Sequence, residues 1–269
     1  AKSELKAIDL SKPLYGAVFT AHPVFSRKYP ALELSARRAS GHDVTYNMGA
    51  HEPRQSISLS EEHSEAMAAI THAREAMLAV TFDLLTRKQT RDLLPKILST
   101  STWVGYDLDG RDDISWIDSF QFRLQEKHMS LNRYVKACKK YSELDLVTHQ
   151  LKKELRHTRA DVDRFAKIPM GEEFFLKAVN GLTQRKEKLT ASSGIAKQIF
   201  AAAKLINDDS RHRKVLAIAG DVCCHGFGMG RIHLRINSAN ISNTMSAIFG
   251  QSFPISEENV STRTLVSRL

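Results

Sequence analysis

Cysteine is scarce in this 269-residue chain, and two of its three cysteines, Cys223 and Cys224, are adjacent. Neighbouring cysteines rarely bond to each other without strain, so a disulfide framework is excluded and we expect reduced thiols. Long apolar runs are also absent, since Val215–Gly220 and Ala66–Ile70 fall far short of the roughly 20 residues that a membrane helix needs. No signal-peptide pattern is visible. These absences favour a cytoplasmic protein that does not cross a membrane.

Acidic residues are outnumbered: 39 lysines and arginines face 30 aspartates and glutamates, for a net charge of +9. Such a surplus suits nucleic acid, an acidic membrane surface or an anionic substrate. Many of the cations, however, are spread among acids in helical patterns, which is typical of a solvated helix face. Few aromatic residues lie between them, so a stacking platform for nucleic-acid bases is disfavoured. These cations are Arg91, Lys96, Lys136, Lys139, Lys140, Lys152, Lys153 and Arg156.

Helical spacing of apolar residues covers most of the chain. Ser58-Leu-Ser-Glu61 resembles a capping box, and the periodicity after it predicts one long amphipathic helix up to Leu85. Residues 30–57 lack such a period and are expected to form a flexible loop region with room for one short helix. Further helices are predicted within 114–168 (two or three), and over 171–188, 194–207 and 211–225, the last ended by Gly226 as a C-cap.

Three short β-prone runs, 15–20, 97–104 and 229–235, are separated by about a hundred residues each. Strands so far apart cannot be joined as hairpins, and they suit parallel strands with helical crossovers. The sequence therefore predicts a single, predominantly α-helical domain over 1–269 with a few parallel β strands. In such folds the chemistry lies in the loops that follow the strands.

Each predicted strand ends in a chemically distinctive segment. The first ends in Thr20-Ala-His-Pro23, where the proline restricts the backbone of His22. The second ends in Thr102-Trp-Val-Gly-Tyr-Asp-Leu-Asp-Gly-Arg111, and the third lies within Gly228–Ser238. In this order and at these distances the three segments resemble the motifs of phosphoenolpyruvate carboxylase. The matching residues are Thr20, Ala21, His22, Pro23, Trp103, Gly105, Asp107, Asp109, Gly110, Arg235 and Ser238.

The resemblance implies part of an eight-stranded α/β barrel that carboxylates phosphoenolpyruvate with bicarbonate and releases oxaloacetate and phosphate. Bicarbonate attacks the phosphoryl group, carboxyphosphate and enolpyruvate form, and CO2 is recaptured at the enolate carbon. His22 would be the essential histidine, since imidazole holds or releases a proton near neutral pH. Arg235 would contact the substrate phosphate, for which its forked guanidinium is suited. Asp107, Asp109, Gly110 and Arg111 would form the supporting strand-end loop. The family also implies Mg2+ or Mn2+ and a homo-oligomer.

Several positions depart from the family motifs. Val24 replaces a polar residue, and Leu108 replaces an arginine of the family motif. Arg111 could supply the positive charge that is lost at position 108. Arg111-Asp112 replaces Asn-Pro, and His233 replaces an acid. The family's metal-binding carboxylates, mobile Gly-Arg-rich loop and other phosphate-binding arginines have no counterpart up to Leu269. We therefore expect the N-terminal portion of a longer enzyme, inactive alone, with the metal ligands outside this segment. The alternative is a non-catalytic basic helical module that binds nucleic acid or a protein partner.

Three other patterns resemble ligand-binding motifs but lack residues or a position that such motifs require. Asp107–Asp113 resembles a calcium loop, but its first and last ligand positions would fall on Gly105 and Trp116. Cys223-Cys-His225 lacks a second Cys/His pair for a soft metal. The glycine-rich Gly226–Gly230 precedes a strand instead of opening a helix, so it predicts a turn and not a phosphate loop.

Overall fold

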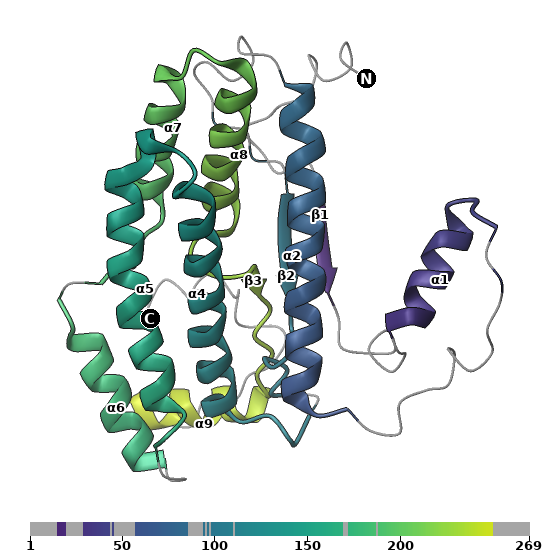
Figure 1. The fold of residues 1–269 in the computed structure, drawn as a ribbon. Coiled ribbons are helices and arrows are strands. Elements are labelled where there is room, and N and C mark those ends of the chain that lie inside the picture. Colours follow the sequence, from purple (N-terminus) through teal and green to yellow (C-terminus); the bar gives the residue numbers. More distant parts are fainter. Residues whose placement is uncertain are drawn as a thin grey trace.

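The computed structural model describes residues 15–19, 29–43, 45, 57–85, 94, 96, 98–109, 111–168, 172–186 and 188–249. Long helices stand side by side as a bundle, with a small sheet beside α2, and α1 stands away from the bundle (Figure 1). The elements are β1 (Tyr15–Phe19), α1 (Tyr29–Ala39), α2 (Leu59–Leu84), β2 (Leu98–Thr102), α4 (Trp116–Cys138), α5 (Asp145–Phe165), α6 (Glu172–Gln184), α7 (Ser193–Leu205), α8 (Asp209–His225), β3 (Arg231–Ile232) and α9 (Ser238–Phe249). A 3-10 turn, Ser142–Leu144, separates α4 from α5.

The sheet confirms the predicted parallel strands. Its order is β1-β2-β3, and both pairings are parallel. The second and third strands are shorter than predicted, because the chain turns after Thr102 and only Arg231 and Ile232 pair as β3. Farther along, Asp107 and Arg235 form a separate parallel bridge. The structure thus has a predominantly helical fold with three parallel strands; it does not describe a closed barrel.

The helix starts follow from local capping chemistry. Ser58 accepts a hydrogen bond from the Glu61 N–H, and the Glu61 carboxylate accepts one from the Ser58 N–H, which confirms the predicted capping box of α2. Ser115 and Asp118 form a second capping box at α4. Gly226 ends α8 with a positive φ of 64°, as its C-cap role requires. The sequence analysis did not predict α9, and α1 supplies the short helix for which the 30–57 region had room.

The apolar core consists of three clusters that follow the layers of the fold. The main cluster joins the last turns of α2 to α4, α5, α7 and α8, with Leu131, Leu151, Ile199 and Leu216 almost fully buried. A second cluster packs α2 against the sheet. A third is aromatic, where Phe120, Phe165 and Phe175 pack at tilted and edge-on angles near α6. Each cluster removes apolar surface from water: the first and third hold the helices to one another, and the second holds α2 against the sheet.

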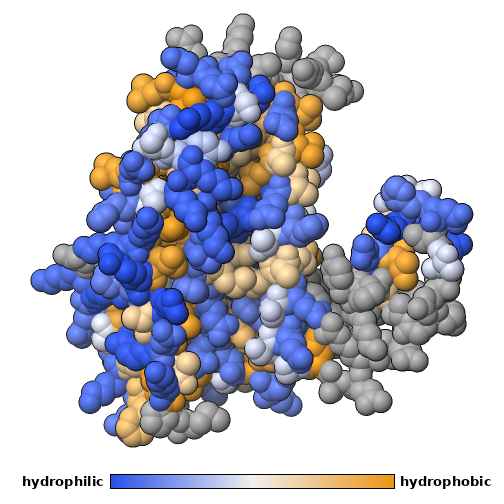
Figure 2. Space-filling model, viewed as in Figure 1, coloured by the Kyte–Doolittle hydropathy of each residue, from blue (hydrophilic) through white to orange (hydrophobic). Residues whose placement is uncertain are grey.

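Hydrophilic side chains dominate the face of the bundle that Figure 2 shows, with apolar patches scattered among them. Lys96, Lys136, Lys139, Lys140, Lys152, Lys153 and Arg156 are all exposed, which confirms the solvated helix face; Arg91 lies outside the described residues. All three cysteines are free. In the described part of the chain, no helix has the length and apolar character to cross a membrane.

Candidate functional site

The three motif-bearing strands end in one row across the sheet. Phe19 pairs with Thr102, and Thr102 pairs with Ile232. Because parallel strands present their carboxyl ends at the same edge, the three strands end together at one edge of the sheet. Thr102 strengthens the row, since its hydroxyl donates to the Phe19 carbonyl at 2.7 Å.

The second and third motifs meet directly at this edge. The Arg235 Nη1 donates to the Asp107 Oδ2 at 2.9 Å. Two backbone hydrogen bonds hold the same segments in register, from the Leu108 N–H to the Arg235 carbonyl and from the Arg235 N–H to the Tyr106 carbonyl. Asp107 is nearly buried, whereas about half of the Arg235 side chain is exposed. A cation is therefore fixed at the sheet edge while part of its guanidinium faces solvent.

The glycine-rich segment before β3 is the predicted turn, and side chains from two helices, α2 and α4, donate to its carbonyls. Tyr134 and Ser130 of α4 donate to the carbonyls of Gly226 and Gly228, both at 2.7 Å. Arg74 of α2 donates to the Met229 carbonyl at 2.9 Å. Arg123 donates to the Gly230 carbonyl at 3.2 Å. These bonds position β3, and with it Arg235, against β2.

A buried ion-pair network joins α2, α4 and α8. The Arg74 side chain is fully buried and contacts Asp221 through Nε at 3.0 Å and Tyr134 through Nη2 at 3.0 Å. The Nδ1 of His225 lies 3.0 Å from Asp221 Oδ1. Burial alone would raise the pKa of Asp221, but the charge of Arg74 and the hydrogen bond from His225 outweigh it and hold that pKa far below its usual range. Asp221 is therefore an ionised partner inside the bundle.

A second buried network fastens the loop after β2. The Glu126 carboxylate accepts hydrogen bonds from the Tyr106 hydroxyl at 2.5 Å and from Arg123 at 2.6 Å, and His63 Nε2 lies 3.3 Å away. Burial would raise the pKa of Glu126, yet the bond from His63 and the charge of Arg123 lower it overall. Gly105 in the same loop has a φ of 83°, and a Cβ there would lie 2.6 Å from the Phe122 ring. The motif glycine thus serves backbone conformation and close packing.

The structure brings some predicted site residues together and separates others. It pairs Asp107 with Arg235, whereas Arg111 binds Glu62 of α2 and Asp113. The guanidinium of Arg111 is thus engaged by two carboxylates. Asp109 is exposed in the turn after Asp107. The segment from Thr20 to Val24 with His22, and also Gly110, lies outside the described residues.

Sequence reasoning missed the residues that position the site. Arg74, Arg123 and Tyr134 lie in helices far from the motifs, and in the sequence each looks like an ordinary residue on a helix. The available signal was charge on an otherwise apolar helical face, as at Arg74 between Ile70 and Leu78. Among the described residues, no group of three or more histidines, cysteines, aspartates or glutamates is placed to hold a metal ion.

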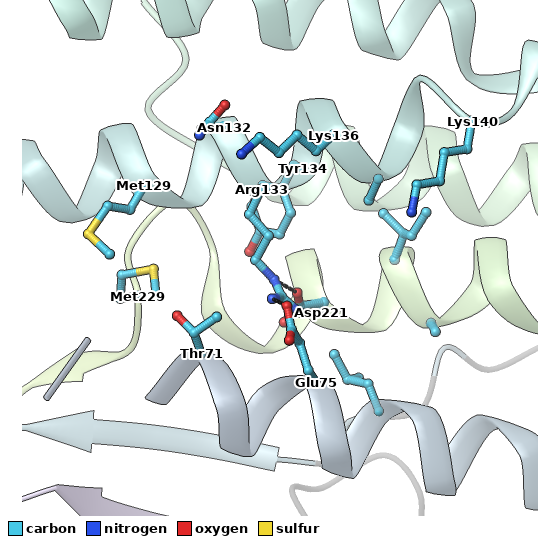
Figure 3. Close-up of a pocket in the computed structure, with 14 residues that line it drawn as sticks. Thr71, Glu75, Met129, Asn132, Arg133, Tyr134, Lys136, Lys140, Asp221 and Met229 are labelled. Atoms are coloured by element: carbon cyan, nitrogen blue, oxygen red, sulfur yellow. Dashed lines mark hydrogen bonds and ion pairs between the residues drawn. The ribbon is translucent and has the colours of Figure 1, made fainter. Parts of the chain in front are cut away.

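A pocket of about 520 Å³ lies between α2, α4 and α8 (Figure 3). Arg133 descends from α4 and contacts Glu75 at 2.5 Å and Asp221 at 3.1 Å, while Lys136 and Lys140 extend from the same helix. Its polar end is thus occupied by ion pairs that hold helices together, which marks it as structural.

No protein-family model matches the chain, and no curated protein matches it significantly.

Proposed function

We propose that this chain is the N-terminal portion of a phosphoenolpyruvate carboxylase-like lyase that forms oxaloacetate and phosphate from phosphoenolpyruvate and bicarbonate. The observation that carries the proposal is the row Phe19, Thr102 and Ile232, where the three strands that precede the motif segments end at one edge of a parallel sheet. The motif segments, which lie far apart in the chain, thus follow neighbouring strand ends, where parallel sheets with helical crossovers commonly hold their chemistry.

Arg235 is the phosphate-binding residue of this proposal. Asp107 occupies its Nη1 among the described residues, so the guanidinium keeps further N–H donors for phosphate oxygens. Asp107 also fixes the orientation of the guanidinium, which reduces the entropy lost when a substrate binds. His22 follows Phe19 by three positions and would handle the proton of the carboxyphosphate and carboxylation steps.

The divalent metal that the resemblance implies has no cluster of ligands among the described residues. In this proposal its ligands lie elsewhere in the longer enzyme. Bound there, Mg2+ or Mn2+ would stabilise charge on the phosphoryl oxygens.

The test is steady-state formation of oxaloacetate by the complete protein, coupled to malate dehydrogenase and followed by loss of NADH. We expect His22→Asn to abolish turnover and Arg235→Gln to lower kcat/KM at least about tenfold, as for a lost charged hydrogen bond. The matched controls are His42→Asn and Arg37→Gln, which alter exposed residues and should leave activity unchanged.

Arg235→Lys separates the phosphate role from a merely structural one. Lysine retains the charge and can keep the pair with Asp107, but it lacks the fork that binds two phosphate oxygens. The KM for phosphoenolpyruvate should therefore rise while the melting temperature stays near that of the wild type. Near-native kcat/KM in His22→Asn would remove this chain from the carboxylase class and favour the basic-module alternative.

A further inference from the structure

The sheet has one face that packs on α2 and a second face that points away from this helix. Phe19 packs against the apolar cluster to which α2 contributes, so the side chains of its row face the helix. Neighbouring residues along a strand point to opposite faces. Val18, Ser101 and Arg231 pair one position earlier in the three strands and therefore point away from α2. Val18 and Arg231 are both exposed there, as expected for a face that the helix does not cover.

The alternation of β3 continues into the third motif segment. The N–H of His233 donates to the Thr102 carbonyl at 2.9 Å, and the N–H of Arg235 donates to the Tyr106 carbonyl at 3.0 Å. Both N–H groups thus point toward the second motif segment, as those of alternate residues in an extended strand do. Arg231, His233 and Arg235 therefore form a row on one face, with about 7 Å between neighbours, twice the rise per residue of a strand.

The second motif segment lies beside this row and contacts it at two places. The ring centroids of Trp103 and His233 lie 6.4 Å apart, with an angle of 39° between the ring planes. Two positions farther along the row, Arg235 donates to Asp107 at 2.9 Å. Aromatic rings at such a separation attract each other, so Trp103 orients the imidazole at the strand end. His233 is nevertheless exposed, and a ligand can meet it from solvent.

The charges along the row favour a ligand with two anionic groups. Arg231 and Arg235 lie on either side of His233, and both arginines are exposed. Asp107 is the carboxylate that the isolated β-bridge brings to the row, and Arg235 occupies it. When Arg235 binds a phosphate, the imidazole one step along the row is placed to donate a hydrogen bond to a second anionic group. The charge of Arg231 on the far side attracts that group as well.

We propose that His233 determines specificity at this site by binding a carboxylate that the substrate carries next to its phosphate. The inference rests on the proposed function, in which Arg235 binds the substrate phosphate. The imidazole supplies an N–H donor for the carboxylate, and Trp103 holds the ring in place. A phosphate ester without a carboxylate leaves this donor unused. The site therefore prefers a phosphorylated acid to an uncharged phosphate ester of the same size.

The test is isothermal titration calorimetry of the 269-residue chain with 2-phosphoglycolate and with ethyl phosphate, at constant ionic strength in chloride. The two probes share the phosphate ester and differ by a carboxylate in place of a methyl group. The wild type should bind 2-phosphoglycolate about tenfold or more tightly, as for a hydrogen bond to a charged group. His233→Ala should lose most of this preference and keep its affinity for ethyl phosphate. His149→Ala, which alters an exposed histidine on α5, is the matched control and should keep the preference.

Arg235→Gln separates this inference from the function on which it rests, and it should weaken the binding of both probes. If it does so while the wild type binds the two probes equally, or while His233→Ala keeps the full preference, the role of His233 is refuted and the phosphate site stands. Unchanged binding of ethyl phosphate in Arg235→Gln, or binding of neither probe by the wild type, would refute the phosphate site and this inference with it. A lowered melting temperature of His233→Ala, with both probes weakened equally, would mean a structural role and would overturn the inference.

Discussion

At the residue scale, the glycines before β3 show how closely this site is packed. Gly228 lies beneath the Arg123 guanidinium, and Gly230 lies against β2, where an added Cβ would stand 2.8 Å from the Thr100 carbonyl oxygen. That oxygen belongs to the backbone of the central strand and cannot rotate away. The absence of a side chain at Gly230 therefore lets β3 approach β2, which places Arg235 beside Asp107.

Gly230→Ala should lower the free energy of unfolding by about 1–3 kcal/mol, because overpacking forces the strands apart. Gly181→Ala is the matched control: Gly181 lies in α6 with no atom within 4 Å of an added Cβ, so alanine should stabilise the helix by roughly 0.5–1 kcal/mol. Urea denaturation followed by circular dichroism measures both values. A Gly230→Ala variant as stable as the wild type would show that β3 need not lie this close to β2.

At the element scale, buried polar contacts fix how α2 and α8 lie against each other. α2 reaches α8 through Arg74 and Asp221, and α8 closes the contact through His225 in its last turn. Breaking a buried pair by removing one partner typically costs about 3–5 kcal/mol, so these contacts fix the relative position of the helices. Burial lowers the pKa of His225 below its ordinary 6.5, although Asp221 acts in the opposite direction.

The lowered pKa of His225 predicts a pH-dependent stability. Below pH 6.5 the unfolded chain binds a proton at this histidine that the folded chain does not bind, so stability falls as the pH falls. His225→Asn keeps a donor for Asp221 and should remove up to about 1.4 kcal/mol per pH unit of that slope as the pH falls below 6.5. His149→Asn, an exposed histidine on α5, serves as the control. Identical slopes in His225→Asn and wild type would refute the assignment.

At the scale of the whole molecule, three parallel strands carry a helical bundle, and the proposed substrate site lies along one open edge. Phosphoryl transfer needs several cations and a metal around the phosphate, since charge stabilisation supplies most of the rate acceleration. Among the described residues, the cation at this edge is Arg235, which is paired with Asp107. Arg111 is engaged by Glu62 and Asp113. Water also weakens electrostatic contacts at an open edge.

We therefore expect the 269-residue chain by itself to form no oxaloacetate above background with Mn2+, bicarbonate and phosphoenolpyruvate. The same coupled assay measures it, with an active phosphoenolpyruvate carboxylase added in a parallel reaction to show that the assay responds. Turnover that follows the concentration of this chain would mean that it carries a metal site of its own, and the assignment of the missing ligands would be wrong.

Local patterns were sufficient to predict much of the fold. The capping box at Ser58, the helical periods and the distances between β-prone runs predicted the helices and the parallel sheet, because capping and amphipathicity act within a few residues. The sequence did not predict α9. The stretch after Ser238 contains apolar residues such as Ile241 and Met245, but Asn, Ser and Thr lie between them, and these residues favour caps and turns over helix interiors.

The candidate site was likewise predicted in part from the sequence and in part revealed only by the tertiary structure. The motif segments and Arg235 were identifiable from order and spacing, but the pairing of Arg235 with Asp107 and of Arg111 with Glu62 came from the tertiary structure. So did the roles of Arg74 and Arg123. The sequence determines which charged and polar groups are present and which segments form helices. Which of these groups meet, and which are buried without a partner, depends on how helices and strands far apart in the chain pack together.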